Sequence, residues 1–484
     1  MAKKAPRKKK ATRKKKALSS SGYEAANGSS KRKASSSVIK FEDEELRERA
    51  RRSLIGTGQY LYRNFSMVGW AIRKHLDYTT QFQFQARTDI PELDEQLERL
   101  MAEWSLPFNC DASARFNFSQ FVRTSEMRRV IDGDVFWVKR RDGKLGAVEA
   151  DLIRTPGSAD KDERWYNGGR INNDGRPIQW GLNRRGSNGH VEFLRRINAK
   201  NVIQLCAFDR FDQVRGVSPL AAAFNSFQDC FEGIDYALAK MKVEQLFAMV
   251  IHSTAGSGSG DHVRQGDGTY EVDFGKGPVK LEMDADDDAK FLGSDNPGSN
   301  TQEFINLVMG MAIKALDLPF NFYDESHTNF FGSRAAWLLY DRSCKAKRSI
   351  LLEALRRVTV WKMQQWVLDG ILVLPDGMNV LDVKYEWVHV GMPWWDPAKE
   401  IEGDLMAIAA GLDNPYRICK ERGRGEWEDN IRKIKQAQDF AKDQGVTLNF
   451  GMTEKPEESE EPEESEESEE SVEEESEEES EEEE

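Results

Sequence analysis

The sequence has few cysteines and no long apolar run. Its five cysteines are scattered along 484 residues and form no CxxC pair. An odd, dispersed set predicts reduced thiols in a cytosolic setting rather than a disulfide framework. No run of 18 apolar residues is present, so no transmembrane helix is predicted, and the basic N-terminus lacks the apolar core of a signal peptide.

Motifs of common catalytic, phosphate and metal sites are also missing. There is no GxxxxGK[ST] loop, no HExxH and no GxSxG. The acidic stretch 284–295 resembles a calcium loop, but Ala289 stands where the turn glycine is needed and Asp295 replaces the closing glutamate. We therefore predict no enzyme activity, no cofactor and no metal. An enzyme acting on DNA ends, such as a nuclease, stays open, because neighbouring carboxylates cannot be recognised from sequence.

The sequence does contain two opposed blocks of charge. Residues 1–40 hold 14 Lys or Arg and one Glu, whereas 454–484 hold 21 Glu and one Lys, within a net formal charge of −14. Blocks of this length cannot pack into a core, so we predict two disordered tails. The basic arm could bind nucleic acid, anionic lipid or an acidic partner, or it could remain solvated. For the Glu-rich end, composition favours solubility or charge repulsion over a specific site.

Over the whole chain the apolar fraction is 39%, with 12 Trp and 25 Phe, so the part between the tails is predicted to fold, and the length predicts two to four units. A helix is expected over 41–67, with Gly56 and Gly58 as a possible break, and another over 91–104. The stretch "DVFWVKRR", followed by "DGK", predicts a strand entering a hairpin. The apolar "KNVIQLCAF" predicts a buried strand.

Two later segments carry matching apolar stripes. Ser218 followed by proline is typical of a helix start, and this helix is expected to reach about Ile251. Residues 252–299 predict a small β insertion with strands at "TYEVDF" and "VKLEM", and helix returns over about 301–316. The stripes predict an antiparallel pair with the insertion projecting from one end. The seam residues are Phe224, Phe227, Phe231, Ile234, Leu238, Met241, Phe304, Val308 and Met311.

The stretch "DESHTNFFGSRAAWLLYDRSCKAKRS" joins a polar, aromatic loop to a helix that is both apolar and basic. The helix is expected from Ser333 to about Asp369, ended by Gly370. Its bases either solvate an exposed face or meet phosphates without base specificity. They flank a predicted packed stripe of Ala336, Leu339, Ser343, Ala346, Ile350, Ala354, Val358 and Trp361.

The remaining folded part predicts a strand pair within 373–391 and then three helices. Asp396 followed by proline starts the first helix, which Gly411 ends, and another begins at Asn414. The last runs over about 426–442. His389 is expected to be a strand residue rather than a metal ligand.

Several stretches, in this order, resemble portal proteins of tailed bacteriophages of the lambda-type family. "LRERARRSLIGTGQYLYRNFSMVGWAI" is similar to that family's Arg-rich opening, "RFDQVRGVSPLAAAF" to its entry into a long helix and "NFFGSRAAWLLYDR" to its loop-to-helix junction. "DPAKEIEGDLMAIAAGLDNPYRICKERGRGEWED" resembles its C-terminal end. The resemblance spans about 23–450. It departs at 330–332, where the family loop is more polar, and at Gly425, where an acid is usual.

The resemblance implies an α+β portal fold with named parts. Residues 41–216 would be an N-terminal wing, helical and then β-rich. The other parts would be stem helices at 217–251 and 300–318, a clip at 252–299, a tunnel loop at 319–332, a long wing helix at 333–375, wing strands at 376–395 and a helical crown at 396–453.

The resemblance also implies a function. The chain would be a head–tail connector of the virion, assembled in the host cytoplasm as a ring of usually twelve subunits at one capsid vertex. Double-stranded DNA would pass through its channel without sequence specificity during packaging and ejection. Its partners would be the terminase large subunit, the major capsid or scaffold protein and head–tail connector proteins, with no membrane. The alternative is a non-enzymatic nucleic-acid-binding protein that uses the Lys-rich arm.

The family's tunnel loop and basic contacts correspond to particular residues here. The tunnel loop would contain Asp324, Glu325, Ser326, His327, Thr328, Asn329, Phe330, Phe331 and Gly332. Possible DNA or inter-subunit contacts would be Arg334, Arg342, Lys345, Lys347 and Arg348.

Overall fold

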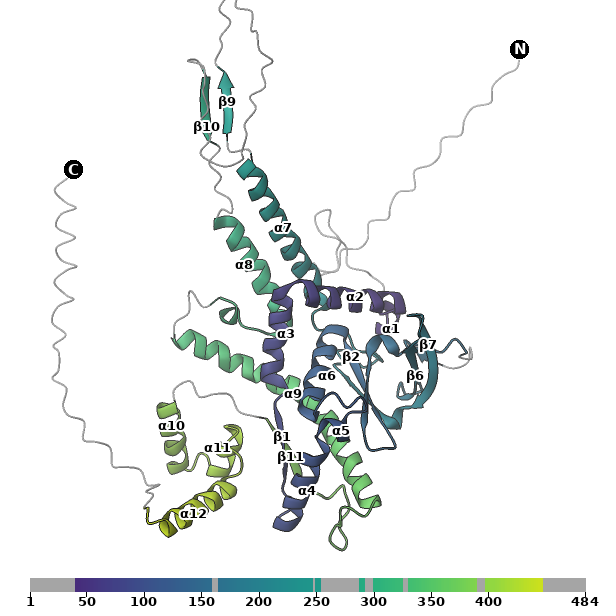
Figure 1. Ribbon diagram of the computed structural model, residues 1–484, viewed down its shortest axis with the longest axis vertical. Helices are drawn as coiled ribbons and strands as arrows, with labels where there is room; N and C mark the ends of the chain where they lie inside the picture. The colour runs from purple at the N-terminus through teal and green to yellow at the C-terminus, as the bar shows by residue number, and fades with distance from the viewer. Residues whose placement is uncertain are drawn as a thin grey trace, which may run out of the picture. The chain divides into compact units, whose positions relative to one another are not determined.

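The computed structural model describes residues 40–158, 164–246, 249–253, 287–291, 299–324, 330–389 and 397–446. The chain forms two compact units, 1–395 and 396–484. Both contain helices, and the first adds antiparallel sheets, which confirms the α+β class (Figure 1). The helices of the first unit are α1 (Glu42–Glu45), α2 (Glu48–Asn64), α3 (Ser66–Thr79), α4 (Pro91–Trp104), α5 (Pro107–Cys110), α6 (Phe118–Asp132), α7 (Phe224–Leu246), α8 (Ser299–Ile313) and α9 (Phe330–Leu368).

Short 3-10 turns connect several of these elements. They are η2 (Ala150–Leu152), η3 (Ala199–Asn201), η4 (Ala221–Ala223), η5 (Lys314–Leu316) and η6 (Phe320–Phe322). The strands are β1 (Phe82–Ala86), β2 (Asp134–Lys139), β3 (Leu145–Glu149), β4 (Trp165–Tyr166), β5 (Gly169–Ile171), β6 (Pro177–Arg185), β7 (Val191–Asn198), β8 (Val202–Cys206), β9 (Met249–Ser253), β10 (Asp287–Phe291) and β11 (Tyr385–His389).

Strand β2 is the central strand of a three-stranded sheet with the order β3-β2-β8. It pairs antiparallel with β3, through the predicted hairpin, and with β8, which is the predicted buried strand. Alternate side chains of a strand point to opposite faces. Accordingly, Val135 and Trp137 lie in one hydrophobic cluster, whereas Phe136 and Val138 lie in another. The strand therefore joins two cores, which is why its sequence is almost continuously apolar.

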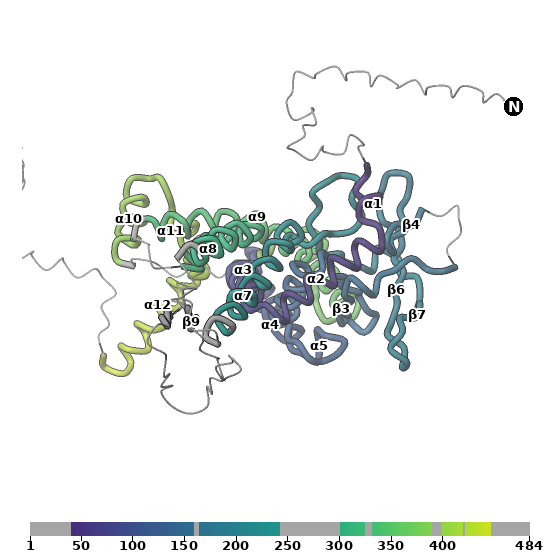
Figure 2. The backbone as a smooth tube through the Cα atoms, turned by 90° about the horizontal axis from the view of Figure 1, so that it is seen from above, coloured from purple at the N-terminus to yellow at the C-terminus, as the bar shows by residue number. Residues whose placement is uncertain are grey.

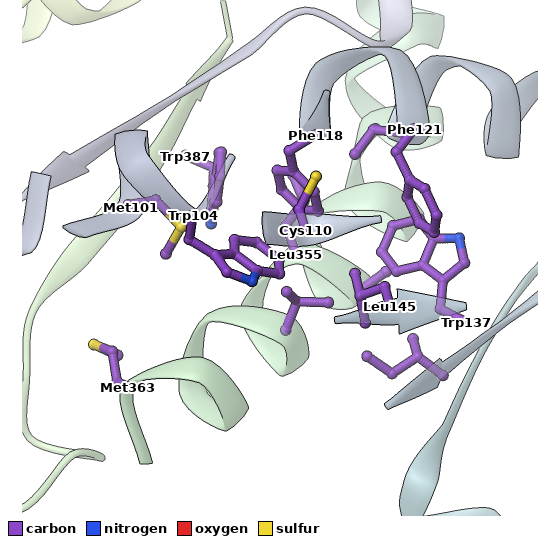
Figure 3. Packing of buried hydrophobic residues seen from close by; sticks show 14 of the residues in the cluster. Met101, Trp104, Cys110, Phe118, Phe121, Trp137, Leu145, Leu355, Met363 and Trp387 are labelled. Atoms are coloured by element: carbon purple, nitrogen blue, oxygen red, sulfur yellow. The ribbon is translucent and has the colours of Figure 1, made fainter. Parts of the chain in front are cut away.

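The first core lies between the three-stranded sheet, α4, α6, α9 and the β1–β11 pair (Figure 3). Trp104 packs against Phe118 with ring centroids 4.9 Å apart, and Phe118 packs against Trp387 at 5.7 Å. The indole N–H of Trp104 donates to the carbonyl of Gly143 at 2.9 Å. Buried tryptophans need such a partner, so the β2–β3 turn is fixed to α4.

Helices α2, α3, α6, α7, α8 and the first half of α9 share a second core. The predicted break at Gly56 or Gly58 was wrong, because α2 runs through both and ends at Asn64. A Cβ on Gly58 would lie 2.8 Å from the carbonyl oxygen of Ile131, so this glycine permits close approach of α2 and α6. The chain turns instead at Phe65, whose backbone is extended and whose ring packs near Phe227.

The paired helices α7 and α8 lie side by side, as predicted (Figures 1 and 2). The Ser218 hydroxyl accepts from Leu220 N at 3.1 Å, and η4 follows before α7. The expected helix to Ile251 was wrong, because Met249–Ser253 forms β9, which pairs antiparallel with β10. β-branched Val250 and Ile251 favour a strand. The strands expected at "TYEVDF" and "VKLEM" lie outside the described residues.

Helix α9 differs from its prediction at one end. It begins at Phe330 rather than Ser333, and ends at Leu368 before Gly370, whose φ of 68° suits a glycine cap. The strand pair expected within 373–391 was also wrong for the described residues. They contain one strand, β11, and its partner is the distant β1, with His389 opposite Phe82.

The second unit contains the three predicted helices, α10 (Pro397–Ala409), α11 (Pro415–Glu421) and α12 (Trp427–Asp443). Arg422 forms ion pairs with Glu400 at 2.7 Å and Asp404 at 3.0 Å, and so ties the end of α11 to α10. Tyr416 and Trp427 pack with centroids 5.1 Å apart. The predicted glycine end of the first helix is confirmed, with Gly411 at φ 71°.

Candidate functional site

The predicted loop before α9 is described only at its two ends. Residues 319–324 form η6 and the turn after it, and Glu325, Ser326, His327, Thr328 and Asn329 lie outside the described residues. Phe330, Phe331 and Gly332 were expected in the loop, but they form the first turn of α9.

An aromatic cluster fixes the N-terminal end of this loop. Phe322 packs against Tyr78 of α3 and Tyr340 of α9, with ring centroids 5.8 and 5.4 Å apart. The Tyr323 hydroxyl donates to Asn306 Oδ1 of α8 at 3.1 Å. Three helices therefore hold the point where the loop leaves the core. Sequence reasoning missed this anchor, although the aromatic spacing in "LPFNFY" could have indicated it.

Two of the five predicted basic contact residues are structural. Arg348 is 7% exposed, donates through Nε to the carbonyl of Tyr78 at 2.9 Å and pairs with Asp341 at 3.0 Å. Lys347 Nζ lies 2.9 Å from Asp317, which precedes η6. These bases attach α9 to the end of α3 and to the start of the loop, so their charges are used within the chain.

The other three bases present a different picture. Arg342 and Lys345 are exposed, with Lys345 3.9 Å from Asp341, whereas Arg334 is half-buried. Next to them, Leu338 and Leu339 are 61% and 69% exposed. The first half of α9 thus displays apolar and positive side chains together.

The predicted buried stripe of α9 was partly wrong. Leu339 and Ala346 were assigned to it and are exposed. The second half is confirmed, because Ala354 and Val358 are buried in the first core and Ile350 and Trp361 pack against it. In the first half of the helix, packing against α3 selects a face one position away from the predicted one, as the contact between Tyr78 and Tyr340 shows. The residues that this face buries are Tyr340, Cys344, Arg348, Leu351, Ala354, Leu355, Val358, Met363 and Trp366.

The predicted seam of the paired helices is buried only near the core. Phe224 and Phe227 are buried, and Phe231, Ile234 and Val308 pack partly against the second core. Leu238, Phe304 and Met311 are 48%, 65% and 56% exposed. Met241 is half-buried. On α8 the face turned to the core is instead Met309, Ala312 and Ile313.

A buried ionic cluster supports these helices. Glu126 of α6 accepts a bidentate pair from Arg129 at 2.7 and 2.6 Å, and its Oε1 lies 2.9 Å from His75 Nε2 of α3. Burial alone would raise the pKa of Glu126, but the Arg129 charge and the hydrogen bonds outweigh it and hold that pKa at about 2. Burial lowers the pKa of His75. A neutral imidazole and a salt-bridged carboxylate therefore join α3 to α6.

A second buried pair explains the "RGVSP" stretch. Arg215 and Asp134 are both about fully buried, and Arg215 Nη2 donates to Asp134 Oδ1 at 2.8 Å and to the Ala150 carbonyl at 3.0 Å. A Cβ on Gly216 would lie 2.2 Å from the Gly133 carbonyl oxygen, so no larger residue fits. This stretch fixes the entry to α7 onto β2, which is a structural role.

The described ranges contain neither a metal-binding group nor a membrane-spanning helix. No group of three or more His, Cys, Asp or Glu side chains there is placed to hold a metal ion. Within the same ranges, no helix combines the length and the apolar character that crossing a bilayer requires.

Comparison with known proteins gives a family match. The model described as "Phage portal protein, lambda family" matches residues 26–348, which is more than half of the chain. No curated protein matches. Three similar solved structures come from gene transfer agent (GTA) particles.

The first, "Virion of native gene transfer agent (GTA) particle", is 15% identical with a TM-score of 0.42, over 76% of this chain and 92% of that chain. "Neck of empty GTA particle computed with C6 symmetry" is 15% identical with a TM-score of 0.43, over 78% and 93%. "Neck of native GTA particle computed with C12 symmetry" is 14% identical with a TM-score of 0.42, over 77% and 92%.

Proposed function

Because this chain belongs to the lambda family of phage portal proteins, we propose that its copies form a ring around a DNA channel at one vertex of a capsid. One observation on the single chain supports a ring. Large exposed apolar surfaces are typical of interaction sites, and within the described ranges the paired helices and the first half of α9 leave large apolar side chains about half exposed or more. They are Leu238, Phe304, Leu307, Met311, Leu338 and Leu339.

These surfaces belong to different helices, so they suit a head-to-tail contact in which one copy covers another. Such a heterologous contact closes into a ring when the rotation that relates one copy to the next is a whole-number fraction of 360°. In this proposal α7 and α8 are the stem, β9 and β10 lie in the clip, and the segment from 319 to the start of α9 is the tunnel loop. The wing contains the sheets and α9, and the second unit is the crown.

The DNA contact in this proposal is weak and without sequence specificity. DNA must slide, so strong hydrogen bonds to bases would be a disadvantage, while a few cations keep the polyanion from being excluded. Arg342 and Lys345 can act so, because both side chains are exposed. The clip segment 252–298 contains ten acids and four bases. This negative charge suits either a lumen that repels phosphate or a docking face.

The partners and location follow from the same proposal. A ring at a capsid vertex would contact the terminase large subunit during packaging. Head–tail connector proteins and the major capsid or scaffold protein would contact it in the finished particle. Its location would be the virion, after assembly in the host cytoplasm. No step of this function requires a chemical reaction by the portal chain.

Mass photometry and negative-stain imaging of the purified protein test the ring. We expect one large species of about twelve subunits. Changing Phe304 and Met311 of α8 together to serine should remove apolar cover and shift the protein to smaller species. The matched control is Phe108→Ser, since Phe108 is 73% exposed on α5. A wild-type protein that stays monomeric at high concentration would refute the proposal.

A further inference from the structure

A basic groove lies between the two larger sheets of the first unit. The β2–β3 hairpin forms one wall and strands β6 and β7 form the other, around a cavity of about 800 Å³. In Figure 2, β6 and β7 lie together at one end of the unit. Five bases line the cavity, and no acid does: Lys139, Arg140, Arg141, Arg195 and Arg196.

A second cavity of about 540 Å³ adjoins the first, and Asn198 lines both. Its three ionisable lining residues are Arg176, Lys200 and Arg357, again without an acid. We call the two cavities together the basic groove. Eight basic side chains and no acidic side chain line this groove. Such a one-sided lining is unusual, because charges of both signs are normally interspersed on a protein surface.

Most of this charge is not neutralised within the described part of the chain. Arg140 pairs with Asp142 at 3.2 Å, and Arg196 donates to the carbonyl of Ser158. For Lys139, Arg141 and Arg195, the described residues provide no carboxylate within ion-pair distance. The basic side chains of the groove can therefore bind an anion that lies outside the described residues.

Part of the groove is also desolvated. Lys139 is half-buried, and its pKa is lowered by burial and by the nearby Arg357 charge. Burial lowers the pKa of Arg357 as well. Two like charges close together in a partly dry site repel each other, and a bound anion would relieve this repulsion.

We propose that the basic groove binds the Glu-rich segment 454–484 of this protein, from the same copy or from a neighbouring one. That segment holds 21 Glu and one Lys, so its charge complements the groove. Each copy of the chain carries one such segment and one groove, so the two are present in equal number. Tethering also raises the effective concentration of the segment near the groove.

The shape of the groove favours a single peptide over DNA. A peptide chain can enter a cavity between two sheets. The major groove of a duplex is by itself about 12 Å wide, so a whole duplex is too thick to enter cavities of about 800 and 540 Å³. Occupation by the protein's own polyanion has a consequence for the proposed channel protein. The wing then lacks an open cation cluster on which passing or neighbouring DNA could be held without specificity.

Carbodiimide cross-linking of the full chain tests the proposal. This reagent joins carboxylates to amines in contact, and mass spectrometry identifies the pairs. We expect cross-links from Glu residues of 454–484 to Lys139 and Lys200. Their yield should fall as NaCl is raised from about 0.05 M to about 0.5 M, because the Debye length shrinks.

Charge reversal gives the decisive comparison. The double variant R141E/R195E keeps both lysine targets and changes two exposed residues, so folding should be unaffected. We expect it to lower the cross-link yield at least about fivefold, because attraction becomes repulsion. The matched control R73E/R99E reverses two exposed arginines on α3 and α4. It should leave the yield within about twofold, since both lie outside the groove lining.

Three results would overturn the proposal. The Glu-rich segment could cross-link only to lysines of the basic arm 1–40. It could also cross-link to exposed lysines everywhere, with no response to R141E/R195E. Finally, the full chain could bind a 30-base-pair duplex, lose that binding in R141E/R195E, and give no cross-link from 454–484 to the groove. The groove would then be a DNA site.

Discussion

Replacing Glu126 by glutamine tests how much the buried ionic cluster contributes to folding. The substitution keeps the side-chain shape but removes the negative charge with which Arg129 pairs, and Arg129 is 4% exposed. Removing one partner of a buried ion pair costs about 3–5 kcal/mol. The pKa gives a comparable figure, because the difference between 4.5 and about 2 corresponds to about 3 kcal/mol. We therefore expect a loss of about 3–5 kcal/mol.

The sign of the pH dependence follows from the same pKa. Glu126 has a lower pKa in the folded chain than in the unfolded one, so its contribution is complete above about pH 4.5. It is lost as the pH falls from about 4.5 towards 2. The wild-type protein should lose stability over this range, and Glu126→Gln should lose less, since its side chain does not titrate.

The assay is urea unfolding followed by tryptophan fluorescence, at one protein concentration because assembly stabilises folded subunits by mass action. Glu353→Gln is the matched control, since Glu353 and Arg356 form an exposed pair at 2.9 Å worth about 0–1 kcal/mol. Adding Arg129→Met to Glu126→Gln should recover part of the loss. Equal midpoints for Glu126→Gln and Glu353→Gln would refute the reasoning.

Three further predictions concern other positions. Gly58→Ala should lower the free energy of unfolding by about 1–3 kcal/mol, because its Cβ would lie 2.8 Å from a backbone oxygen. Gly56→Ala lies in the same helix, and its Cβ would meet no atom within 4 Å, so in the same urea assay it should raise the free energy of unfolding by about 0.5–1 kcal/mol. Burial lowers the pKa of His389 to about 4, so the unfolded chain binds this proton at a higher pH than the folded chain does. The wild-type protein should therefore lose stability as the pH falls from about 6.5 to about 4, and His389→Phe should lose less over this range. Changing Phe330 and Phe331 together to alanine should leave rings intact and reduce retention of packaged DNA in infection assays; unchanged retention would count against a gating role.

Local signals in the sequence predicted many elements correctly. The proline at position 91 marked the start of α4, and the alternation of "DVFWVK" with a following "DG" marked the β2–β3 hairpin. These features depend on neighbours within a few residues. The β1–β11 pair was not predicted, because its strands are about 300 residues apart and their pairing is decided by the shared first core.

Helix faces were predicted less well than helices. Apolar residues occupy adjacent positions from Ala336 to Tyr340, so periodicity alone could not select the buried face of α9. Packing against α3 buries Tyr340 and leaves Leu339 exposed. The bases divide in the same way, since only tertiary contacts distinguish the buried Arg348 from the exposed Arg342. The sequence could predict a helix that is apolar and basic, but not which of its residues are buried or paired within the same chain.

This division separates folding from assembly. The ionic groups that are buried, such as Glu126 and Arg348, find partners within the same chain, so they contribute to the fold of a single copy. The apolar groups without cover, such as Phe304 and Leu338, add nothing to that fold and cost free energy in water until another copy covers them. Changes at Glu126 should therefore lower the urea midpoint without removing the ring contact. Changes at Phe304 should remove the ring contact and leave the urea midpoint of dissociated single copies unchanged. A protein in which both changes lower both quantities equally would not have this separation.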